Sequence, residues 1–218
     1  MDWQNIDTVL LDMDGTLLDL HFDTFFWLEH LPVRYAELHS IDQTQAQQWL
    51  HQRIRQEQGT LNWYCLDYWS RELDVDIAKL KHEIKERIAF RPHVHDFLAH
   101  LESENIRRVI VTNAHRDSLS LKLEETGLDK LVDAIICSHD YKLPKEEQGF
   151  WHKLQEDEPF DPQRTLLVDD SLAVLASARQ YGIAYLLSII QPDSQQAKRQ
   201  IDDFQAIQHF NEIIKKPT

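Results

Sequence analysis

Short apolar runs separated by amphipathic segments recur along most of this chain. The segments between the later runs have apolar residues at helical spacing, and two of these segments end at Gly127 and Gly182. Strands that alternate with helices predict a parallel sheet with right-handed crossovers. The predicted fold is therefore α/β, a doubly wound parallel sheet. A strand buried on both faces is expected at each of five runs, residues 9–11, 108–112, 133–137, 165–168 and 183–187.

The stretch from residue 17 to residue 91 lacks this alternation. Its apolar residues follow helical spacing in four segments, the last of which includes Ile88 and ends before Arg91-Pro92. Roughly seventy residues are far more than normally join a strand to the next helix. We therefore expect a core of residues 1–16 and 92–218 and an inserted helical cap of residues 17–91. Direct packing of these helices on the sheet is the alternative. Two short helices are expected in the polar tail after Gln195.

The composition indicates an ordinary globular protein, with 218 residues, 42% hydrophobic and 28% charged. No apolar run approaches the roughly 20 residues of a transmembrane helix, and no signal peptide is recognisable. Cys65 and Cys137 lack metal-motif spacing and suit a reducing compartment, so we expect a cytoplasmic protein without a membrane partner. A net charge of −14 argues against a nucleic-acid polymer as partner, because such binding depends on Lys and Arg.

Two carboxylates stand where the first predicted strand ends. Asp12 and Asp14 are two residues apart, so both side chains can project toward one side of the sheet. Gly15 permits a sharp turn, and Thr16 adds a small hydroxyl. Crowded acids repel each other unless a cation or proton lies between them, and ligands bind at the carboxyl edge of open α/β sheets. An ordinary Asp-Gly turn is the structural alternative.

Polar groups also follow two later segments. Thr112 and Asn113 end the second strand with a hydroxyl, an amide and free backbone N–H groups, which suit a phosphate, although a turn or helix cap would use the same residues. Lys145 is expected to open a helix, where a cation is unfavourable for the helix dipole, so a partner elsewhere is plausible. Lys142 competes with it for any functional role.

Adjacent acids, Asp169 and Asp170, end another buried strand. A helix N-cap explains one such acid well and two less well. With Asp-x-Asp-Gly-Thr, strand-Thr-Asn and Lys, they complete a pattern that resembles the haloacid dehalogenase superfamily of phosphohydrolases. The resemblance spans nearly the whole chain, including a helical cap between the first two motifs. It implies that Asp170 is a direct metal ligand and that Asp169 supports it.

The resemblance implies a role for each remaining motif residue. Asp12 would attack phosphorus and form an aspartyl-phosphate. Asp14 would act as general acid and base, and its backbone carbonyl would also bind metal. Thr112 and Asn113 would bind the phosphate, while Lys145 would neutralise the nucleophile and the phosphate. The cofactor would be Mg²⁺, held by the four acids Asp12, Asp14, Asp169 and Asp170.

Other members of the superfamily fit less well. Dehalogenases generally lack the second acid, so Asp14 argues against dehalogenation, and the ATPase motif Lys-Thr-Gly is absent. A phosphatase or mutase acting on a sugar phosphate is the closest enzymatic alternative. A degenerate member that serves as a non-catalytic interaction module is the remaining one.

Several stretches resemble more narrowly the bacterial purine 5′-nucleotidases that act on GMP and IMP. The resemblance implies a purine nucleoside monophosphate, with its phosphate in the core and its base against the aromatic cap. Trp63 is the best candidate to stack on the base, and Arg34, Asn62 or His115 could contact the six-position oxygen. The stretches that carry this resemblance are residues 3–9, 17–20, 112–115 and 144–148.

Overall fold

The core of the computed structural model, which describes residues 1–214, is a six-stranded parallel sheet in the order β3-β2-β1-β4-β5-β6. β1 is central, and its last residue Leu11 lies in register with Ile110 on one side and Val168 on the other. The polar residues that follow these strands therefore emerge side by side. The strands are β1 (Thr8–Leu11), β2 (Arg107–Thr112), β3 (Ala134–Cys137), β4 (Thr165–Val168), β5 (Tyr185–Ile189) and β6 (Gln205–Ile207).

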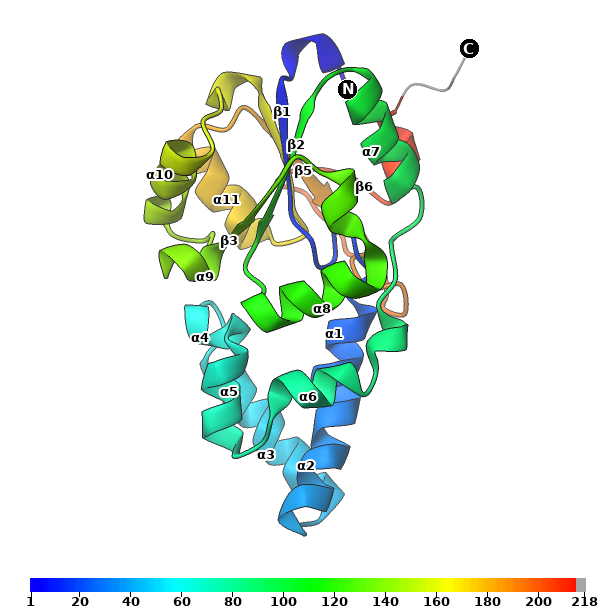
Figure 1. The fold of residues 1–218 in the computed structure, drawn as a ribbon, viewed down its shortest axis with the longest axis vertical. Helices are drawn as coiled ribbons and strands as arrows, with labels where there is room; N and C mark the ends of the chain where they lie inside the picture. Colours follow the sequence, from blue (N-terminus) through cyan, green and yellow to red (C-terminus); the bar gives the residue numbers. More distant parts are fainter. Residues whose placement is uncertain (215–218) are drawn as a thin grey trace.

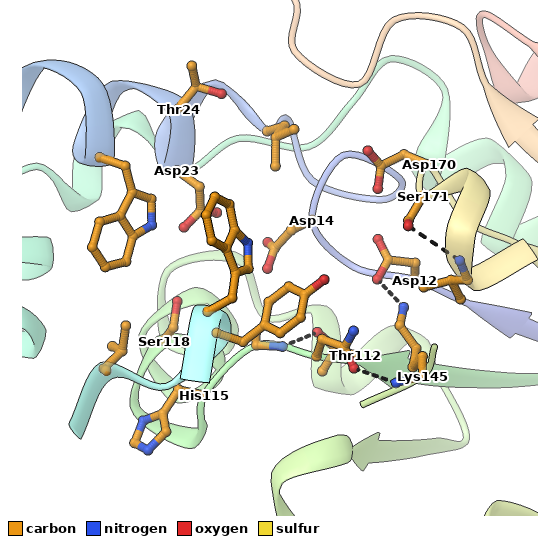
Figure 2. Close-up of a pocket in the computed structure, with 18 of the residues that line it drawn as sticks. Asp12, Asp14, Asp23, Thr24, Thr112, His115, Ser118, Lys145, Asp170 and Ser171 are labelled. Carbon is orange, nitrogen blue, oxygen red and sulfur yellow. Dashed lines mark hydrogen bonds and ion pairs between the residues drawn. The ribbon is translucent and has the colours of Figure 1, made fainter. Parts of the chain in front are cut away.

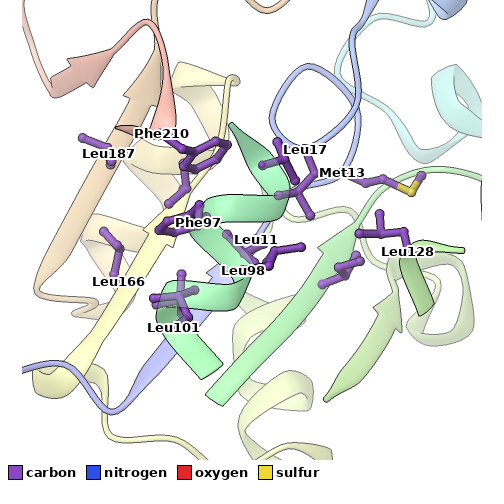
Figure 3. Packing of buried hydrophobic residues seen from close by; sticks show 14 of the residues in the cluster. Leu11, Met13, Leu17, Phe97, Leu98, Leu101, Leu128, Leu166, Leu187 and Phe210 are labelled. Atoms are coloured by element: carbon purple, nitrogen blue, oxygen red, sulfur yellow. The ribbon is translucent and has the colours of Figure 1, made fainter. Parts of the chain in front are cut away.

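Helices cover both faces of this sheet, as apolar parallel strands require. Leu11 points into a cluster with Phe97 and Phe210 on one face, which Figure 3 shows. Leu10 packs with Trp151 and Leu175 on the other face. The predicted α/β doubly wound class is confirmed. The covering helices are α7 (Val94–Ser103), α8 (Arg116–Thr126), α9 (Ser138–Tyr141), α10 (Gln148–Asp157) and α11 (Leu172–Tyr181).

The helices between β1 and β2 form a cap with its own apolar cluster, which includes Phe26, Leu50 and Trp69. Leu121 of α8 joins that cluster, so the cap rests on α8 rather than on the sheet, as Figure 1 shows. The cap helices are α1 (His21–Phe25), α2 (Leu31–His39), α3 (Gln43–Gln56), α4 (Leu61–Tyr64), α5 (Leu66–Leu73) and α6 (Ile77–His82), with a π-helical turn at Phe26–His30 and a 3-10 turn at Lys85–Arg87.

Two adjacent backbone segments attach the cap to the core. Leu18 on the way out forms an antiparallel bridge with Phe90 on the way back. The backbone N–H of Asp19 also donates to the carbonyl of Ala89 at 2.9 Å. The cap therefore enters and leaves the core at one place.

Some predicted elements differ from the structure. The tail was predicted to contain two short helices, but it contains β6 and a 3-10 turn at Phe210–Glu212. β6 is a strand because Ala206 pairs with Ser188 at the sheet edge, a contact that the polar local sequence does not reveal. The fourth cap helix was predicted to extend to Ile88, but α6 ends at His82. None of the helices within residues 1–214 has the length and apolar character needed to cross a membrane.

Candidate active site

A cavity of about 400 Å³ lies between the carboxyl edge of the sheet and the cap. This volume is in the range of small-molecule sites, roughly 300–1,000 Å³. Figure 2 shows the carboxylates of Asp12, Asp14 and Asp170 turned toward the same space. The cap contributes mainly aromatic and apolar side chains, among them Trp27, Leu28, Trp63, Tyr64 and Trp69.

Asp12 follows β1 directly and is 7% exposed. Its Oδ1 accepts a hydrogen bond from Nζ of Lys145 at 2.6 Å, whereas its buried Oδ2 has no hydrogen-bond partner among the described residues. Burial, opposed by the ammonium of Lys145 and reinforced by the charge of Asp169, raises the pKa of Asp12 from 3.8 to about 6. One carboxylate oxygen is therefore anchored, and the other is available to a ligand.

Lys145 contacts the carboxylates of Asp12 and Asp169. Its buried Nζ donates to Asp169 at 2.7 Å as well as to Asp12. Burial disfavours its charge, but the two carboxylates outweigh burial and raise the pKa of Lys145. Lys142, the competing candidate, is exposed and ends α9 with a φ of 56°. The expectation that Lys145 opens a helix was wrong, because α10 begins at Gln148 and the helix dipole plays no part in its position.

The loop after β2 is held by its own side chains. Oγ1 of Thr112 accepts the backbone N–H of Ala114 at 3.0 Å. The Asn113 amide accepts the backbone N–H of Lys145 at 3.0 Å and donates to Glu146 at 2.9 Å. The Asn113 side chain thus fixes the lysine loop, and a phosphate would meet the Thr112 hydroxyl and backbone N–H groups here.

Three acids form a cluster that suits a divalent cation. Asp12, Asp169 and Asp170 each place a carboxylate oxygen within 4.8 Å of the others. Burial and the charges of Asp12 and Asp169 raise the pKa of Asp170 well above its ordinary value. Gly15 adopts a φ of +88°, and a Cβ there would lie 2.9 Å from Cγ of Asp170, so glycine permits this close approach. An oxygen-only set of three carboxylates fits a hard cation such as Mg²⁺.

Asp14 belongs to a buried ion network that reaches into the cap. Lys122 of α8 is 1% exposed and donates to Asp14 and to Asp23 of α1, each at 2.6 Å. Asp23 also binds the buried Lys81 of α6. Burial, partly offset by Lys122, raises the pKa of Asp14 to about 6. For Asp23 the two ammonium groups outweigh burial and lower its pKa.

Sequence reasoning missed this network. The available signal was a charged residue at a position where helical spacing predicts a buried apolar residue. Lys122 lies three residues after the buried Leu119 on the same face of α8, and Asp23 directly follows the buried Phe22. A charged residue in such a stripe is rarely buried without a partner.

Aromatic side chains of α4 reach the cavity from the cap. Trp63 lines it and is half-buried, as expected for a residue that contacts a ligand. Tyr64 lines it too, and its hydroxyl donates to Glu146 of the core at 2.9 Å. The cap wall is therefore tied to the lysine loop.

Of the three polar residues suggested for a base, His115 alone is among the side chains that line this cavity. His115 precedes α8 as its N-cap. Arg34 instead pairs with Glu83 at 3.0 Å, and Asn62 is exposed and donates to Glu57 at 3.4 Å. Arg34 and Asn62 therefore lie outside the lining of this cavity.

The model of the haloacid dehalogenase-like hydrolase family matches residues 9–188. That range begins in β1 and includes all the motif residues described above. The chain belongs to the haloacid dehalogenase-like hydrolases. The family resemblance inferred from the motifs is thus confirmed.

This haloacid dehalogenase-like hydrolase is 41% identical over 212 residues to GMP/IMP nucleotidase YrfG of Escherichia coli (strain K12), with 97% of this chain and 96% of that protein covered. The Shigella flexneri protein of the same name gives the same values. A HAD phosphatase structure from Thermococcus onnurineus has a TM-score of 0.80 at 21% identity, covering 95% of this chain and 96% of that one, and shares the fold. The chain is an enzyme of the phosphatase type.

Proposed function

We propose that this enzyme is an Mg²⁺-dependent 5′-nucleotidase that releases phosphate from GMP or IMP through an aspartyl-phosphate on Asp12. The observation that carries the mechanism is the free Oδ2 of a buried Asp12 whose other oxygen is bound to Lys145. The printed function of the 41% identical relative supports the choice of substrate.

In the first step, Oδ2 of Asp12 forms a bond to phosphorus while the bond from phosphorus to the 5′-oxygen breaks. Asp14, protonated, donates its proton to the leaving alkoxide. Lys145 keeps the nucleophile oriented through Oδ1, and the Thr112 hydroxyl with neighbouring N–H groups stabilises the charge on the equatorial oxygens.

In the second step, Asp14 accepts a proton from a water molecule as that water attacks phosphorus. The bond from phosphorus to Asp12 breaks, and inorganic phosphate leaves with Asp12 restored. Splitting a very slow hydrolysis into two steps lowers each barrier.

The residues that would hold Mg²⁺ are Asp12 and Asp170, with Asp169 behind them and the backbone carbonyl of Asp14 beside them. When bound, Mg²⁺ neutralises the phosphate dianion, which would otherwise repel the Asp12 carboxylate. The convergence of the three carboxylates and the raised pKa of Asp170 support this assignment.

The cap, which we place at residues 17–91 between core segments 1–16 and 92–218, would select the substrate. Trp63 would stack on the purine, and His115 would contact its polar edge. An aromatic platform for one base contributes roughly 1–3 kcal/mol, enough to prefer a nucleotide over a sugar phosphate. A cytoplasmic location, expected from free Cys65 and Cys137, belongs to the same proposal.

Phosphate release from a panel of substrates tests this proposal. With Mg²⁺ present, kcat/KM should be higher for GMP and IMP than for AMP, pyrimidine monophosphates and glucose 6-phosphate. Excess chelator should abolish turnover of all of them. A maximum on a sugar phosphate would overturn the nucleotidase assignment, and full activity in chelator would overturn the metal assignment.

A further inference from the structure

Cys65, His115 and His139 converge beside the active-site cavity, outside the carboxylate cluster. Cys65 joins α4 to α5 in the cap, whereas His115 precedes α8 and His139 lies in α9 of the core. One donor atom from each residue lies within 4.8 Å of the other two, and all three residues are half-buried. The three residues are far apart in sequence, so their convergence depends on the cap meeting the core.

These donor atoms are weakly engaged. Nε2 of His139 is buried and has no hydrogen-bond partner among residues 1–214. Cys65 is a free thiol whose sulfur accepts the backbone N–H of Tyr68 at 3.4 Å, a long contact. His115 accepts the N–H of Asp117 at 3.4 Å through Nδ1. An imidazole with an unpartnered buried nitrogen, next to a thiol and a second imidazole, suits a ligand that accepts electron pairs.

One thiolate and two imidazoles suit zinc-type ions rather than Mg²⁺. Bonds of about 2.3 Å to sulfur and 2.0–2.1 Å to nitrogen place neighbouring ligand atoms about 3.5 Å apart in a tetrahedron. The three donor atoms, all within 4.8 Å of one another, are already close to that spacing. Asp67, whose Oδ2 lies 3.6 Å from Nε2 of His115, or a water can occupy the fourth position.

We propose that Cys65, His115 and His139 form a binding site for a divalent transition-metal ion of the zinc type. Binding removes the proton of the Cys65 thiol, which passes to solvent. The ion joins the start of α5 to the core at the rim of the cavity. The neighbouring bond from Tyr64 to Glu146 joins the same two parts, so the ion reinforces an existing cap contact.

Occupation of this site inhibits the phosphatase. His115 lines the cavity, and an ion bound to it withdraws the imidazole from the substrate. The same ion holds the cap against the core. Because product release requires the cap to move, the ion also slows this step. Zinc-type ions therefore inhibit at a place separate from the carboxylate site.

Co²⁺ is the spectroscopic probe for the site. It is added to reduced protein that has been freed of transition metals and is kept in saturating Mg²⁺. One equivalent of Co²⁺ should give the intense visible bands of a tetrahedral ion and a sulfur-to-cobalt charge-transfer band, and Zn²⁺ should displace it. Cys65→Ser retains an oxygen that can cap α5 and should lose the charge-transfer band. His139→Gln should weaken Co²⁺ binding by at least about 10-fold. Loss of a residue that only hydrogen-bonds a metal ligand already weakens metal binding by about that factor.

Two controls separate this site from the rest of the protein. Cys137→Ser removes the other cysteine, and Asp170→Asn alters the carboxylate cluster; both should keep the charge-transfer band. Zn²⁺ should inhibit the wild type in saturating Mg²⁺, and Cys65→Ser and His139→Gln, with near wild-type basal turnover, should resist. Thermal unfolding establishes that each variant is folded.

Three results would overturn the proposal: no sulfur band in the wild type, a band that survives Cys65→Ser, or equal zinc inhibition in the wild type and both ligand variants. The last result would place inhibition at the carboxylates instead.

Discussion

Replacing Lys122 by methionine should uncouple Asp14 from the cap and leave two half-buried carboxylates, Asp14 and Asp23, without their shared cation. Lys122 is 1% exposed and forms two ion pairs of 2.6 Å, with Asp14 and Asp23. Breaking a buried pair by removing one partner costs about 3–5 kcal/mol of unfolding free energy. This is a large part of the roughly 5–15 kcal/mol that a typical domain has.

Turnover should fall as well, because Lys122 orients the proposed general acid. General acid–base catalysis contributes about 10²–10⁴-fold, so we expect a kcat loss on the order of 10²-fold. The stability loss should be larger at pH 8 than at pH 5.5. Burial already raises the pKa of Asp14 to about 6, and without Lys122 that carboxyl gains stability by staying protonated at low pH.

Urea unfolding at the two pH values and steady-state kinetics measure both effects. Lys153→Met, at an exposed lysine of α10, is the matched control and should match the wild type. Asp23→Asn removes the ion pair of Lys122 with the cap but keeps the ion pair of Lys122 with Asp14. It should therefore lower kcat less than Lys122→Met. The reasoning fails if Lys122→Met is within about 1 kcal/mol of the wild type and has an unchanged kcat.

Three further outcomes are expected. Asp12→Asn should lower kcat by about 10⁴-fold or more. It should not lower the melting temperature, because burial disfavours the charge of the carboxyl that it replaces. Turnover near the wild-type rate would exclude Asp12 as nucleophile. The melting temperature of the metal-free protein should rise as pH falls from about 7.5 to 5.5. The folded protein raises the pKa values of Asp12 and Asp14 from 3.8 to about 6, so ionisation of these carboxyls above pH 6 lowers its stability. A melting temperature that does not change with pH in chelator would contradict this. Trp63→Ala should lower kcat/KM for GMP about 10–100-fold but leave kcat/KM for ribose 5-phosphate unchanged. Trp49→Ala, at an exposed tryptophan, is the control. Equal losses of kcat/KM on both substrates would argue against base stacking.

Local sequence was sufficient where a residue's role follows from its own strand. The apolar runs placed β1 and β4 in the sheet, and the acids after them could be expected at one edge because parallel strands end together. That Asp12 and Asp170 meet at this edge could be predicted for this reason.

Local sequence was insufficient where a partner comes from a distant segment. Lys122 is 108 residues from Asp14 and 99 from Asp23, and no local pattern pairs them. The Asn113 amide accepts the backbone N–H of Lys145, 32 residues away, a contact that no local pattern indicates. Cys65 was judged by its spacing to the other cysteine, whereas its neighbours are histidines of the core.

The central place of β1 has a consequence for how a cell makes this enzyme. β1 precedes β4 by roughly 150 residues, which a ribosome adds in about 8–30 s at 5–20 residues per second. Throughout that time β1, which carries the apolar Leu10 and Leu11, lacks β4, one of the two strands that pair with it. We therefore expect a nascent chain of this length to bind chaperones, because β1 can pair with β4 only after β4 has been synthesised. Ribosome stalling before β4 should yield chains that retain a chaperone and never acquire phosphatase activity.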